Sequence, residues 1–138
     1  MGIFDKLTGS KKVQFTPKLA LATAAITIIA ADGVLDDQEL FDLNRIVHGD
    51  RNIIDAAVNV VRGTKLPEVI DLVAGTLDEK QRLTTMAILL DLAMSDGILA
   101  GEEQTLLQAY MEKFSITEAA LKPVIDTIAL KNDFSIFS

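Results

Sequence analysis

The chain has few of the residues that most catalytic and metal centres use. It contains no cysteine and a single histidine among its 138 residues. Without cysteine there is no disulfide framework, no thiolate zinc site and no cysteine nucleophile. One histidine, His48, leaves little for a histidine metal centre or a catalytic triad. Carboxylates are therefore the main side chains with which this sequence can build a catalytic or metal centre.

The chain also lacks a long uninterrupted hydrophobic run. Its longest apolar stretch, "LALATAAITIIAA" at residues 19–31, is shorter than the roughly 20 residues that span a bilayer, so we interpret it as a buried core helix. The first residues, "MGIFDKLTGSKK", have no apolar segment of the kind that export signals contain. With 49% hydrophobic residues, the chain is expected to fold as one domain, and the cytoplasm is the simplest location.

Positive charge is scarce outside the start of the chain. Residues 1–18 hold four lysines and one aspartate, whereas the other 120 residues hold 9 basic and 19 acidic groups, for a net charge of -7 overall. We therefore expect a basic leader at residues 1–14 and an acidic helical domain at residues 15–138. An acidic body repels phosphate backbones, so nucleic acid is not an expected partner and divalent cations are more natural ligands.

Helix signals follow one another with almost no strand pattern. Caps and apolar periodicity predict an all-α fold, a compact bundle of about seven helices. Two of the predicted helices, at about residues 17–31 and 79–94, are apolar on nearly every face, as central helices are. Thr16 and Thr117 are expected N-caps, and Pro123 is expected to kink or restart the last helix.

Both apolar helices end at the same motif, "ADGVLDDQEL" from Ala31 and "SDGILAGEEQ" from Ser95. The two regions align without a gap at a spacing of 64 residues, which indicates an internal duplication of a helix, an Asp-Gly turn and a helix, with two connecting helices between the copies. The equivalent pairs are Ile28 and Leu92, Asp32 and Asp96, Gly33 and Gly97, Leu35 and Leu99, Glu39 and Glu103, and Leu43 and Leu107.

The first motif is adequately explained as helix punctuation. Gly33 suits a helix end, while Asp36 and Glu39 form a capping-box pattern. In the second copy Ala100 replaces Asp36 and cannot cap, yet Asp96 and Glu103 keep their places. A carboxylate that persists without its capping partner has either another structural partner or a ligand.

Each motif also matches the second half of a calcium loop. Asp-Gly, five residues and a Glu is the end of the EF-hand pattern, but the earlier ligand positions are occupied by Ile28 and Ala30, or by Leu92 and Met94. These side chains offer no oxygen. Each turn is at most half a site, and a cation site requires the fold to bring the two turns together.

Paired Asp-Gly turns with a following Glu, each after an apolar helix, resemble the tellurite resistance TerB family and its TerB-like domains. The resemblance covers about residues 15–131 and implies a bundle of about seven helices whose turn acids bind a divalent metal. Carried over by position, it implicates Asp32, Glu39, Asp96 and Glu103, with Asp36, Asp37 and Glu102 as weaker candidates because the two copies do not share them. The metal, calcium, magnesium or another, is not specified by the sequence.

Three isolated features have simpler interpretations. Asp91 lies inside an apolar helix and is expected on its exposed stripe rather than as a further metal ligand. His48 is expected to favour a helix C-terminus. The leader, with Ile3, Phe4 and Leu7 beside lysines, has the composition of a segment that contacts an anionic membrane or a partner, although such segments more often are disordered or pack on their own domain.

Three functions follow from these observations. The leading hypothesis is a non-catalytic binding module that engages protein partners and holds a metal, linked by the resemblance to tellurite resistance or general stress response. The alternative is a purely structural interaction domain without metal. A metal-assisted hydrolase is less favoured, since the sequence shows no nucleophile and base pair and no phosphate-binding glycine loop.

Overall fold

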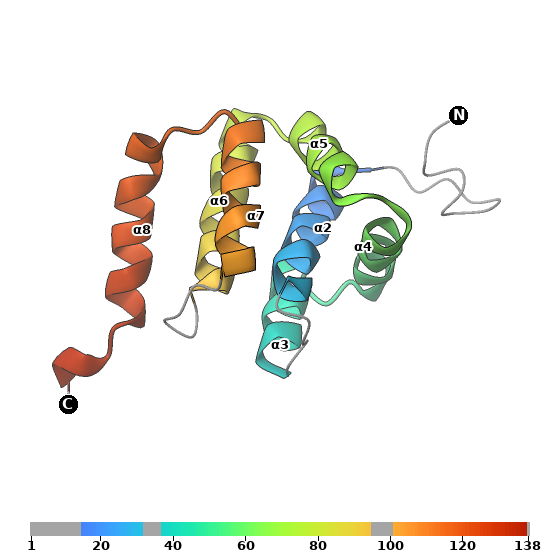
Figure 1. The fold of residues 1–138 in the computed structure, drawn as a ribbon. Helices are drawn as coiled ribbons and strands as arrows, with labels where there is room; N and C mark the ends of the chain where they lie inside the picture. The colour runs from blue at the N-terminus through green and yellow to red at the C-terminus, as the bar shows by residue number, and fades with distance from the viewer. Residues whose placement is uncertain (1–14, 32–36, 95–100, 138) are drawn as a thin grey trace.

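The computed structural model describes residues 15–31, 37–94 and 101–137, with the backbone alone for residues 37–40. The described residues form seven α-helices and a short 3-10 helix, η1, and the predicted all-α fold is confirmed (Figure 1). The helices are α2 (Pro17–Ala30), α3 (Asp37–Ile46), α4 (Arg51–Gly63), α5 (Leu66–Thr76), α6 (Glu79–Ala93), α7 (Gly101–Lys113) and α8 (Glu118–Asn132), with η1 at Ser135–Phe137.

Side-chain caps fix the starts of four helices. The Thr16 hydroxyl accepts a hydrogen bond from the Leu19 amide at 3.2 Å, and Thr117 accepts one from the Ala120 amide. Asp78 and Gln81 form a reciprocal capping box with distances of 2.8 and 2.9 Å, which satisfies two amides that the first turn leaves unpaired. Asp50 caps α4. The predicted caps Thr16 and Thr117 are confirmed, and α8 continues through Pro123.

The two apolar helices form the centre of the bundle. α2 and α6 pack side by side and run in the same direction, while α3 and α7 return antiparallel to them (Figure 1). Nine of the 14 residues of α2 are buried, and several of these are alanines. Small side chains let other helices approach closely, so α2 contacts α3, α4, α5, α6 and α7.

A third helix follows each copy of the duplicated unit, with its N-cap at a spacing of 67 rather than 64 residues, Asp50 for α4 and Thr117 for α8. α4 packs against α2 on one flank and α8 packs against α6 on the other (Figure 1). The turns before α4 and α8 also correspond, since each contains a non-glycine residue with positive φ, His48 and Ser115, and each ends in a capping side chain. The sequence predicted two connecting helices between the copies; the arrangement in space makes α5 the connection.

One buried hydrogen bond links the two copies. The Thr27 hydroxyl of α2 donates to the Ala24 carbonyl at 2.6 Å and lies 2.7 Å from the Tyr110 hydroxyl of α7. Because Thr27 has a single hydroxyl proton, Tyr110 donates to Thr27. Tyr110 is fully buried, and burial raises the pKa of its hydroxyl.

Replacing Tyr110 with phenylalanine is expected to lower the free energy of unfolding by about 1 kcal/mol, since it removes one buried hydrogen bond and leaves the ring in place. Urea unfolding measures the change. The matched control makes the same replacement in a Thr27→Val background, where the loss is expected to shrink because the partner is already absent. Equal losses in the two backgrounds would show that the bond contributes nothing.

Candidate functional site

The helix ends that flank both Asp-Gly motifs lie at one end of the bundle. α2 and α6 finish there, and α3 and α7 begin there (Figure 1). Ala30, directly before the first motif, and Ala31, its first residue, line the same groove as Gly101 and Glu102 of the second motif. This follows from the parallel packing of α2 and α6, and it is the arrangement that a shared site requires.

The predicted site residues divide into three groups. Asp32, Asp36 and Asp96 lie outside the described residues. Asp37 and Glu39 belong to the first turn of α3, where the backbone alone is described, and Glu102 and Glu103 belong to the first turn of α7. An acidic side chain in a first turn interacts favourably with the helix dipole, so these positions suit a structural role as well as a ligand.

Carboxylate oxygens are the donors that calcium and magnesium prefer, and the donor set predicted here fits such ions. Among the side chains that the structure describes, those of residues 15–31, 41–94 and 101–137, no three acidic or histidine side chains gather closely enough to hold an ion. In the same residues, no helix is long and apolar enough to cross a membrane.

A groove runs from the motif end of the bundle along α2, α5 and α7, and we call it the α2/α5/α7 groove. Its volume is about 1220 Å³. Apolar and small side chains line most of it, and Thr27 contributes to its wall. The lining side chains without charge include Ala30, Val61, Leu66, Pro67, Ile70, Thr105, Leu106 and Ala109.

Charged side chains border this groove. Lys113 of α7 and Asp71 of α5 form an ion pair at 2.8 Å. The hydrogen bond from Lys113 to Asp71 and the negative charge of Asp71 raise the pKa of Lys113. Glu102 and Glu112 add two exposed carboxylates on α7. With the lysine paired, the border of the groove is net acidic.

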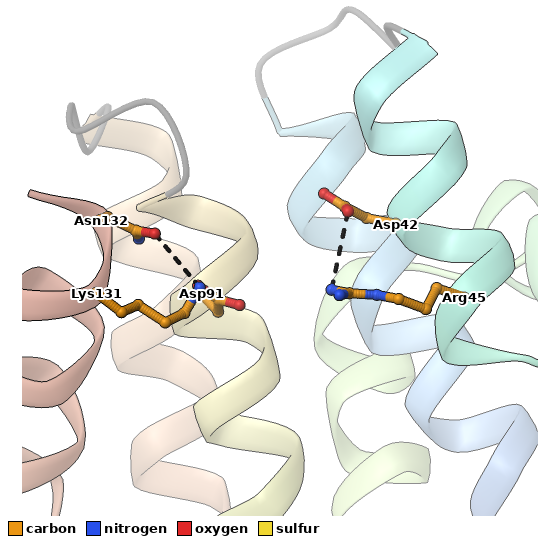
Figure 2. A network of polar contacts seen from close by, with 5 residues as sticks. All are labelled: Asp42, Arg45, Asp91, Lys131 and Asn132. Carbon is orange, nitrogen blue, oxygen red and sulfur yellow. Dashed lines mark hydrogen bonds and ion pairs between the residues drawn. The ribbon is translucent and has the colours of Figure 1, made fainter. Parts of the chain in front are cut away.

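A smaller, polar cleft of about 420 Å³ lies between α3, α6 and α8. Figure 2 shows its charged side chains: Asp42 and Arg45 on α3 are 3.9 Å apart, and Asp91 on α6 pairs with Lys131 on α8 at 3.0 Å. Lys131 also donates to the side-chain oxygen Oδ1 of Asn132 at 3.3 Å. The Asp91 side chain is 32% exposed. It is therefore half-buried in a salt bridge between helices, rather than simply solvated as the sequence suggested.

The two clefts occupy equivalent places in the duplicated halves. Positions 64 residues apart pair Thr27 with Asp91, Leu106 with Asp42 and Ala109 with Arg45. Where α2 and α7 cross, the side chains at these positions are small or apolar. Where α6 and α3 cross, the equivalent side chains are charged. The same backbone arrangement therefore presents two different surfaces, one beside each central helix.

A comparison with protein-family models identifies the family to which this chain belongs. The model described as tellurite resistance protein TerB matches residues 18–124, well over half of the chain. The chain belongs to the TerB family. The same chain matches no curated protein and no solved structure at a significant level. The family match confirms the resemblance that the paired motifs indicate.

The TerB match ends inside α8. Beyond it the chain carries four strongly exposed apolar side chains, 72–81% accessible: Leu130, Phe134, Ile136 and Phe137. Two of them, Phe134 and Phe137, are aromatic. This segment extends the TerB-matched part of the chain.

Sequence reasoning missed the α2/α5/α7 groove and the polar cleft. The signal for the cleft was present in the alignment of the two copies, since a charged pair, Asp42 and Arg45, replaces Leu106 and Ala109 at equivalent positions. The groove has no comparable signal, because it depends on where α5 packs.

Replacing Lys131 with methionine is expected to lower the free energy of unfolding by about 1 kcal/mol or less, because a partly exposed ion pair is worth little. The amides of α8 are expected to exchange faster with solvent, since the pair joins α8 to α6. Hydrogen exchange measures this.

The matched control for that variant is Lys122→Met, whose partner Asp126 lies 3.0 Å away within α8 itself. It removes the same charge without removing a link between helices. Equal exchange rates in the two variants would show that the Lys131 pair does not hold α8 against α6.

Proposed function

We propose that this TerB-family chain is a non-catalytic binding module with a divalent cation held between its two Asp-Gly motifs. The cation would be held by Asp32, Glu39, Asp96 and Glu103, with Asp36, Asp37 and Glu102 as weaker candidates. The observation that carries the proposal is the common end of α2 and α6, whose flanking residues Ala30 and Gly101 line one groove.

Electrostatics supports a cation rather than an anion at this end. The chain carries a net charge of -7, and four acidic residues lie in the first turns of α3 and α7. Two half-sites that each supply carboxylates from a turn and a following helix approach the six to eight oxygens that calcium takes, water included. In this proposal the cation cross-links the two copies of the duplication.

The biological setting of the module is also a proposal. Membership in the TerB family supports a role in tellurite resistance or a wider stress response, and the cytoplasm is the simplest location for it. Two grooves beside α7, the α2/α5/α7 groove and a second of about 710 Å³ between α6, α7 and α8, would serve as surfaces for protein partners.

Calcium, magnesium or manganese is expected to raise the melting temperature of chelator-treated protein, because an ion that binds only the folded state stabilises it. The double variant Asp32→Asn with Asp96→Asn is expected to lose this rise. Differential scanning fluorimetry across the cations measures both. An unchanged melting temperature of the wild type with every cation would contradict the metal site.

A second double variant, Asp55→Asn with Asp126→Asn, serves as the control. It removes two exposed carboxylates from α4 and α8, away from the motif end, and is expected to keep the cation-dependent rise. If Asp32→Asn with Asp96→Asn instead loses a little stability equally with and without metal, the motifs serve as helix punctuation, since asparagine also caps. That outcome would support the purely structural alternative.

A further inference from the structure

The α2/α5/α7 groove has an apolar surface that no described residue covers. Leu66, which lines it, is 46% exposed. Leu66 and Pro67 from α5 face small side chains of α7, Thr105 and Ala109, across this groove. Exposed apolar surface of this extent is typical of a site that takes an apolar segment.

The charge of the groove border restricts which segment can bind there. Three carboxylates border the groove, from Asp71, Glu102 and Glu112, against the single cation of Lys113, which already pairs with Asp71. An occupant with apolar side chains and lysines is therefore attracted, and an acidic one is repelled.

The leader of this same chain has this composition. Residues 1–14 contain Lys6, Lys11 and Lys12 against the single acid Asp5, together with the apolar residues Ile3, Phe4 and Leu7. The spacing of Ile3, Phe4 and Leu7 matches one face of a helix turn. No other segment of the chain combines three lysines, one acid and an apolar cluster within so short a length.

The leader is long enough to reach the groove from its own domain. Seven residues lie between Leu7 and Phe15, where the described structure begins, and the eight residue steps span up to about 27 Å when extended. α2 has 14 residues and is about 21 Å long at about 1.5 Å per residue. Leu7 can therefore reach either end of α2.

We propose that residues 3–12 dock in the α2/α5/α7 groove of the same molecule, with Ile3, Phe4 and Leu7 on its apolar floor and the lysines beside its acidic border. This inference shares only Glu102 with the proposed metal site and does not require a bound cation. It makes the leader an internal occupant that a partner with a similar basic, apolar segment has to displace.

Photo-crosslinking in the full-length protein tests the proposal. With p-benzoylphenylalanine in place of Phe4, irradiation is expected to join residue 4 to peptides from α5 or α7, in a product that runs as a monomer. Mass spectrometry identifies the joined peptides. The same probe in place of Phe134 is the position control, and it is expected to give no crosslink to the groove.

A charge-matched pair of variants checks the electrostatic argument. Glu112→Lys reverses one charge at the groove border and is expected to lower the crosslink yield several-fold. Asp55→Lys makes the same change in charge on the exposed face of α4 and is expected to leave the yield unchanged. Both positions are exposed, and the melting temperature verifies that each variant folds.

Four results would overturn the proposal. A crosslink mainly between two molecules would mean that the leader docks on a second copy. A crosslink to α3 or α8, or none to the groove, would assign the leader elsewhere. Equal yields in Glu112→Lys and Asp55→Lys would remove the charge complementarity on which the proposal rests. If residue 4 is shielded from solvent only when vesicles with anionic lipid are present, the leader is a membrane-binding segment.

Discussion

The parallel packing of α2 and α6 determines most of this structure. α2 has no polar face, and α6 has only a narrow polar stripe with Lys80, Thr84 and Asp91, so both are stable only with other helices around them. Buried alanines on α2, among them Ala20, Ala24 and Ala25, let its neighbours approach closely. Larger side chains at such positions typically cost 1–3 kcal/mol, because a close-packed core has no room for them.

Because the two central helices run in the same direction, the features that end them lie at the same end of the molecule. A duplication related by an axis across the helices would have separated the two Asp-Gly motifs. The observed arrangement instead places the ends of α2 and α6, and the starts of α3 and α7, together. The buried bond from Tyr110 to Thr27 joins α7 of one copy to α2 of the other next to the groove.

The two halves have diverged around this common frame. α5 covers one side and produces an apolar groove, while the equivalent side of the second half is a charged cleft in which Lys131 bridges to Asp91. In the first half, the helix α5 follows α4. In the second half, only the short η1 follows α8 in the described chain. Symmetry in sequence therefore coexists with asymmetry in the surfaces offered to ligands.

The local features of the fold were predictable from sequence, because caps and helix periodicity act within a few residues. Thr16, Thr117 and the apolar helix α2 are examples, and the duplication was readable as far as its second helix. The third helix that follows each copy was not, since α4 and α8 share a position in space more than a sequence pattern. Contacts between distant helices, such as Lys131 with Asp91, depend on packing angles that no short pattern encodes.

The candidate site divides in the same way. The sequence supplied its residue types and spacing, and the structure supplied the common end that a shared site needs. The ligand set itself, Asp32, Glu39, Asp96 and Glu103, stays a prediction. Its geometry depends on how the two turns meet, which local rules of turn and cap formation do not determine.

The central claim is that two half-sites form one cation site. Equilibrium dialysis against manganese or calcium, with the bound ion counted per chain, tests it most directly. A shared site predicts one ion per chain in the wild type and weakened binding in both Asp32→Asn and Asp96→Asn. Two independent ions per chain, with each variant losing only its own, or no bound ion at all, would contradict it.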